Sequence, residues 1–104
     1  MAVEVVIKRK FVEEKARELT PLIVKLRSLA RSQPGYISSE SLKCVYPLDD
    51  YDYFIRSKWD SLEACYGWLQ SPERSKIQQS IDTISGGKTE YRIYEPLVGD
   101  IIDK

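Results

Sequence analysis

The spacing of apolar residues changes repeatedly along this chain, and these changes limit the folds open to it. Residues 2–10 alternate apolar and polar positions, with Val3, Val5 and Ile7 on one side, as in a half-buried strand. From Val12 to Ala30, apolar residues recur every three or four positions, which predicts one amphipathic helix of about five turns. With the later segments, the predicted order is β-α-β-β-α-β.

Turn and cap residues separate the first elements. Pro34 and Gly35 end the first helix, and Pro21 inside it is expected to kink or divide it. Residues 36–46 form the second predicted strand, whose polar middle is typical of a sheet edge. The third strand is expected over residues 52–59.

The second half of the chain has equally clear boundaries. A helix is expected to open at Asp60 or Ser61, and Ser71-Pro72 marks the start of another. Gly86-Gly87 ends that helix, and residues 88–94 alternate as a fourth strand. The sequence Gly86-Gly87-Lys88-Thr89 is a loop and not a phosphate-binding P-loop, because it follows a helix and precedes a strand.

This order predicts an α+β, ferredoxin-like fold, in which a four-stranded antiparallel sheet carries its helices on one face. Residues 1–95 are expected to form one domain, and the apolar tail 96–104 to dock on this subunit or its partner. The other sheet face is expected to mediate a homodimer, because it would be too apolar for water. The residues assigned to that face are Val6, Tyr36, Leu42, Cys44 and Phe54.

Composition excludes several partners. The 16 basic and 16 acidic residues give a net charge of zero, which argues against nucleic acid as a partner. The triplet Lys8-Arg9-Lys10 is interpreted as a solvated strand end. No apolar run is long enough to span a membrane, and no secretory signal is visible, so the expected location is the cytoplasm.

The chain contains no histidine and no asparagine. The commonest general base and the usual zinc and haem ligand are therefore missing, and no metal site is expected. Cys44 and Cys65 are expected to be unpaired. The acidic cluster at Asp49, Asp50 and Asp52 is interpreted as a solvated turn rather than a calcium site.

Two tryptophans, Trp59 and Trp68, bracket the short helix after the third strand. Either indole could fill the core or line an aromatic pocket, and core packing is favoured for Trp68. The segment Trp59 to Ala64, the turn Gln33 to Tyr36 and the run Trp68 to Pro72 resemble the antibiotic biosynthesis monooxygenase family over about residues 3–95.

The resemblance implies a dimeric α/β barrel in which two ferredoxin-like sheets face each other. Some relatives oxidise aromatic phenols or anthrones with dioxygen and no cofactor, and others degrade haem. Haem degradation is disfavoured, because Gln78 stands where that branch has its iron-ligating histidine and Ile7 where it has an asparagine. The other branch also has an asparagine where this chain has Ile55.

The leading hypothesis is a cofactor-independent monooxygenase acting on a small aromatic or quinol-like compound, with Trp59 as the candidate catalytic residue. The alternative is a non-catalytic dimer that binds a small hydrophobic ligand or serves a structural role. The candidate pocket lies between helices and sheet. Its expected substrate-binding residues are Ile7, Tyr53, Ile55, Trp59, Tyr66, Trp68, Ile77 and Tyr91.

Overall fold

The computed structural model describes residues 2–10, 13–47, 52–87 and 89–97. It contains strands β1 (Val3–Lys10), β2 (Tyr36–Lys43), β3 (Asp52–Trp59) and β4 (Glu90–Tyr94), and helices α1 (Ala16–Arg31), α2 (Leu62–Leu69) and α3 (Pro72–Ser85), with a short 3₁₀ turn, Glu13–Lys15. The acidic turn at positions 49 and 50 and most of the tail lie outside the described residues.

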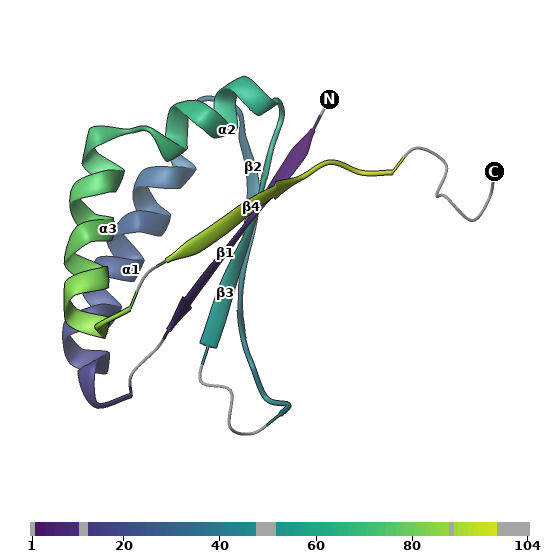
Figure 1. Cartoon of the computed structure of the whole chain (residues 1–104). Coiled ribbons are helices and arrows are strands. Elements are labelled where there is room, and N and C mark those ends of the chain that lie inside the picture. The colour runs from purple at the N-terminus through teal and green to yellow at the C-terminus, as the bar shows by residue number, and fades with distance from the viewer. Residues whose placement is uncertain (1, 11–12, 48–51, 88, 98–104) are drawn as a thin grey trace.

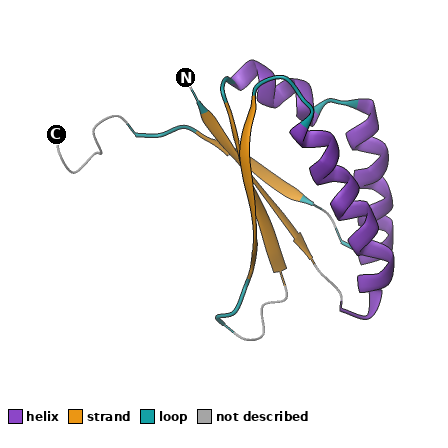
Figure 2. Cartoon of the chain, turned by 180° about the vertical axis from the view of Figure 1, so that it is seen from behind, coloured by secondary structure: helices purple, strands orange, loops and turns teal. Residues whose placement is uncertain are grey.

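The four strands form one antiparallel sheet in the order β2-β3-β1-β4. All three helices cover the same face, and the other face is bare in the single chain (Figures 1 and 2). This is the predicted α+β, ferredoxin-like arrangement, and it confirms the fold class read from the sequence.

Helix α1 is continuous through Pro21, so the predicted division of the helix is wrong. Proline removes one backbone donor, which leaves the carbonyl of Arg17 without its helical partner. Both Pro21 and Arg17 are exposed, so water can satisfy that carbonyl and the helix does not need to break.

The edge strand β2 contains a bulge that changes which side chains face the helices. Tyr36 pairs with Trp59, whereas Ser38 pairs with Lys58, so Ile37 is the extra residue. The assignment of Tyr36 to the open sheet face is therefore wrong. Its ring meets the Trp59 indole edge-on in the core, with centroids 5.6 Å apart, because an extra residue reverses the alternation.

The core lies between the sheet and the helices. Strand β1 contributes Val3, Val5 and Ile7, and Trp59 lies fully buried at the end of β3. Helices α1 and α3 pack side by side on this layer. Their most deeply buried residues are Leu19 and Ile81. Neither cysteine forms a disulfide, as predicted.

Candidate functional site

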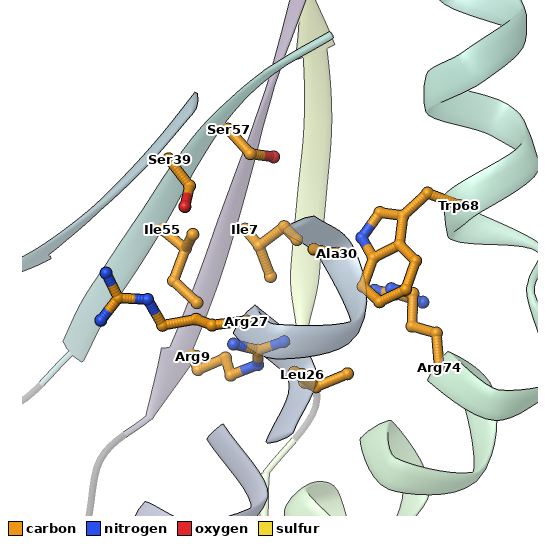
Figure 3. Close-up of a pocket in the computed structure, with 10 residues that line it drawn as sticks. All are labelled: Ile7, Arg9, Leu26, Arg27, Ala30, Ser39, Ile55, Ser57, Trp68 and Arg74. Carbon is orange, nitrogen blue, oxygen red and sulfur yellow. The ribbon is translucent and has the colours of Figure 1, made fainter. Parts of the chain in front are cut away.

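A cavity of about 30 Å³ opens between the sheet and the helices. Figure 3 shows its walls, in which side chains from three strands face side chains from three helices. The lining residues are Ile7, Arg9, Leu26, Arg27, Ala30, Ser39, Ile55, Ser57, Trp68 and Arg74. The walls are mostly aliphatic and aromatic, and the charged groups among the lining residues are all arginines.

Arg9 reaches this cavity because of strand alternation. It stands two residues after Ile7 on the face of β1 that is directed towards the helices, and only 3% of its surface is exposed. Its Nη2 donates a hydrogen bond of 2.7 Å to Oε1 of Gln78 on α3. The interpretation of the triplet at residues 8–10 as a solvated strand end is therefore wrong for Arg9.

Gln78 connects Arg9 to a small polar network. Its Nε2 donates to Oδ1 of Asp82 over 3.0 Å and also to Oγ1 of Thr89. The Thr89 hydroxyl in turn donates to the same Asp82 oxygen over 2.7 Å. The amide of Gln78 is thus fully engaged, and its position opposite Arg9 is fixed.

Arg74 enters the cavity from the first turn of α3. The Ser71 hydroxyl caps this helix by accepting from the Arg74 backbone N–H over 3.4 Å, and Pro72 occupies the first turn. The Arg74 side chain is 4% exposed, and its Nη1 donates to the Leu69 carbonyl over 3.3 Å. Its guanidinium carbon lies 5.5 Å from the centre of the Tyr91 ring.

The electrostatics of the site follow from burial. Burial lowers the pKa of Arg74, and the charge of Arg9 lowers it further. Tyr91, Asp82 and Cys65 act in the opposite direction. Burial also raises the pKa of the Tyr53 hydroxyl, while the charge and hydrogen bonding of Arg9 partly oppose this. Tyr53 is therefore a neutral phenol at neutral pH.

The two tryptophans form an aromatic stack at the cavity wall, with Trp68 lining the cavity and Trp59 behind it. The rings of Trp59 and Trp68 are 6.2 Å apart and inclined by 22°. Trp59 is fully buried and donates from Nε1 to the Ser57 hydroxyl over 3.0 Å. Ser57 and Trp68 line the cavity, so Trp59 supports two wall residues without lining the cavity itself.

The structure brings some of the predicted site residues together and separates others. Ile7, Ile55 and Trp68 line the cavity. Trp59 and Ile77 belong to the adjoining core. Tyr53 is half-buried, and the charge of Arg9 acts on its hydroxyl. Tyr66 and Tyr91 are about half exposed, at 48% and 49%.

Sequence reasoning missed Arg9 and Arg74 as cavity residues. A signal for Arg9 was present, because it continues the alternation of Val5 and Ile7. The Ser71-Pro72 helix start places Arg74 in the first turn of α3. The burial of its side chain, however, depends on how α3 packs against the rest of the protein, and the local sequence does not show this.

Haem does not fit this site. The chain has no histidine, and the Gln78 amide, at the position where the resemblance implies the iron ligand, is engaged by Arg9, Asp82 and Thr89. Within the described residues, no group of three or more His, Cys, Asp or Glu side chains is placed to hold a metal ion. No described helix is long and apolar enough to cross a membrane.

Several solved structures share this fold. A conserved protein from Methanosarcina mazei Go1 is 18% identical, with a TM-score of 0.80 and coverage of 93% of this chain and 94% of its own. SnoaB, a cofactor-independent oxygenase from Streptomyces nogalater, is 14% identical, with a TM-score of 0.73 and coverage of 92% and 93%. A protein from Mycobacterium tuberculosis is 14% identical, with a TM-score of 0.77 and coverage of 93% and 96%.

No curated protein has a significantly similar sequence. The sequence itself matches the family model described as antibiotic biosynthesis monooxygenase over residues 2–80, which is most of the chain. The resemblance seen in the tryptophan segment is thereby confirmed. This chain belongs to the antibiotic biosynthesis monooxygenase family.

Proposed function

We propose that this protein is a cofactor-independent monooxygenase acting on a small aromatic or quinol-like compound. The observation that carries the proposal is the cavity, which combines an indole, aliphatic walls and buried guanidinium groups in one small space. Family membership and the likeness to the fold of SnoaB support it. The substrate's aromatic ring would lie against Trp68, Ile7 and Ile55.

The chemistry requires an anion and dioxygen. An acidic substrate loses a proton, and its carbanion passes one electron to dioxygen. The resulting superoxide and carbon radical combine into a peroxide anion, which takes up a proton and then loses water to leave a carbonyl. A methylene group and dioxygen thus become a carbonyl group and water, with no external reductant. A dry site with fixed positive charge favours the first step by stabilising the anion.

The described lining residues include no carboxylate, lysine or tyrosine that could accept the proton. The proton would therefore pass to solvent water, and the nearby positive charge would favour its loss by stabilising the substrate anion. Trp59 would act through its contacts with Ser57 and Trp68, holding the wall against which the ring stacks.

Cavity size sets a condition on binding. Benzene fills a cavity of about 150 Å³, whereas this cavity measures about 30 Å³ and holds a molecule the size of water or dioxygen. A side chain that lines the cavity must therefore move before an aromatic substrate can bind. We assign this movement to Arg27, which lines the cavity and is only half-buried.

We also propose a homodimer through the open sheet face. That face carries Val6, Phe54 and Leu42 beside Arg56, which contacts Glu4 and Glu40. A single chain leaves this face of the sheet without a covering layer (Figure 2).

The alternative function is non-catalytic binding of a small hydrophobic ligand. The absence of a proton acceptor among the described lining residues favours it. Both functions use the same cavity, but only the monooxygenase converts its ligand into a product.

Oxygen uptake separates them. Chelator-treated protein is mixed with anthrones, naphthols and quinols, and dioxygen consumption is recorded beside Trp68→Phe, with Gln79→Ala on the exposed side of α3 as the control. We expect metal-free uptake that falls at least tenfold in Trp68→Phe and is unchanged in Gln79→Ala. Quenching of tryptophan fluorescence without uptake would favour the binding function, and the lack of both would exclude both functions.

A further inference from the structure

Two buried arginines face one small cavity. Arg9 enters it from β1 and Arg74 from α3, and each is at least 96% buried. Figure 3 shows both guanidinium groups directed into the space between sheet and helices. Buried arginines normally have a partner, because removing an ionised group from water is costly unless another charge compensates it.

Most of the donors on these groups are unused within the described part of the chain. Nε and Nη1 of Arg9 have no hydrogen-bond partner, and neither do Nε and Nη2 of Arg74. The bonds to the Gln78 side chain and the Leu69 backbone go to neutral oxygens, and the Tyr53 hydroxyl beside Arg9 is neutral as well. Each guanidinium therefore retains two nitrogen atoms, with three N–H groups between them, that can bind an additional acceptor.

The local charge is not balanced either. The carboxylate that acts on Arg74 is Asp82, and its Oδ1 already accepts from Gln78 and Thr89. No ion pair to Arg9 or Arg74 is found among the described residues. Two guanidinium groups against one carboxylate leave an excess positive charge at the cavity.

The surrounding walls indicate what the acceptor is attached to. Trp68, Ile7 and Ile55 lie in the same cavity as the two arginines, and they offer an aromatic and aliphatic surface rather than further donors. A free inorganic anion would gain nothing from these walls, whereas an aromatic ring bearing an ionised oxygen would use both parts of the site.

We propose that Arg9 and Arg74 form a binding site for an oxyanion, and that this oxyanion is the carboxylate, phenolate or enolate of an aromatic ligand. The inference rests on the proposed function and deepens it, because it names the substrate class of the same cavity. Arginine suits this role, since its planar fork matches an oxyanion and its charge persists over the physiological pH range.

Calorimetric titration with a matched pair of probes tests the site. The probes are 2-naphthoate and the neutral 2-naphthamide, which have nearly the same shape, with inorganic phosphate as a separate probe. We expect 2-naphthoate to bind at least about tenfold more tightly than 2-naphthamide, as expected when a charge-assisted hydrogen bond is lost. Equal binding of the two probes would overturn the proposal. If phosphate bound as tightly as 2-naphthoate, the part of the proposal that assigns the oxyanion to an aromatic ligand would be wrong.

Variants assign the effect to the arginines. Arg74→Gln should bind 2-naphthoate at least about tenfold more weakly, and Arg74→Lys should retain part of the preference. The control is Arg92→Gln, an exposed position on the open sheet face. Unchanged binding in Arg74→Gln would overturn the proposal.

Thermal melting without ligand separates a binding role from a structural one. An uncompensated buried charge does not stabilise the fold, so Arg74→Gln should melt at the same temperature as the original protein or higher. A clear drop would assign Arg74 to fold stability and overturn the binding role. None of these measurements requires turnover, so they test the oxyanion site separately from the proposed function. Selective binding of 2-naphthoate by a protein that consumes no dioxygen would support the oxyanion site and contradict the monooxygenase function.

Discussion

Gly35 has almost no space for a side chain. Its φ of +85° lies in the left-handed region, and a Cβ atom there would sit 2.5 Å from Cβ of Ala64 and 2.6 Å from Oδ1 of Asp60. Its carbonyl accepts from the Asp60 N–H over 2.8 Å. Gly35 thus joins the turn before β2 to the start of α2, close to the Trp59 end of the site.

We predict that Gly35→Ala lowers the free energy of unfolding by about 1–3 kcal/mol, through backbone strain and the steric overlap. Gly67→Ala is the matched control, because nothing lies within 4 Å of its Cβ position and its helical backbone favours alanine. That variant should gain up to about 1 kcal/mol. Urea unfolding measures both. A Gly35→Ala protein as stable as the original would contradict the argument.

At the scale of secondary structure, α3 organises the site. Arg74, Gln78 and Asp82 follow each other at intervals of four residues and therefore lie along one side of the helix. Ile77, Ile81 and Ile84 form the neighbouring apolar row that anchors α3 in the core. The Ser71 cap at one end and the left-handed Gly86 at the other fix the limits of the helix.

Ser71→Ala should destabilise the protein by about 1 kcal/mol, because the first turn of α3 loses its side-chain acceptor. It should also weaken 2-naphthoate binding, since the cap bonds the backbone of Arg74 itself. Ser80→Ala, on the exposed side of the same helix, is the control and should change stability by less than about 0.5 kcal/mol. Urea unfolding and calorimetry provide the two readouts. Weaker binding in Ser80→Ala of equal size would argue against a specific effect of the cap.

On the scale of the whole molecule, the sheet has one covered and one open face. The open face mixes the apolar Val6 and Phe54 with the ion pairs of Arg56. Glu4 and Glu40 come from the two strands that flank β3, so Arg56 bridges the middle of the face. Such a surface suits a second copy of the chain, because isologous contacts can bury the apolar residues and satisfy the charges together.

Val6→Asp should therefore convert the proposed dimer to a monomer of 12.1 kDa, because it places a carboxylate in the middle of the contact. Gln79→Asp adds the same charge on the helical side and should leave the dimer intact. Light scattering coupled to size-exclusion chromatography gives the mass. An unsubstituted protein that runs at 12.1 kDa would refute the dimer.

The local sequence determined the elements of this protein. Strand alternation, the Ser71-Pro72 start and the Gly86 end each depend on neighbouring residues, so the order of elements and the α+β fold were predicted correctly. The resemblance to the antibiotic biosynthesis monooxygenase family was also visible in local segments, and the family model confirms it. Pro21 shows the limit, because its effect on α1 depended on solvent exposure, and the sequence pattern does not state exposure.

The site depended on contacts between distant elements. Arg9 and Gln78 are 69 residues apart, and only packing of α3 on β1 brings them within 2.7 Å. The bulge in β2 turned Tyr36 inward, and the stacking of α2 on β3 put Trp68 rather than Trp59 at the cavity wall. Periodicity determines which residues share a face, because it is a property of the local backbone. Which charges become buried, and beside what, is decided by the tertiary structure alone, since desolvation depends on atoms far away in the chain.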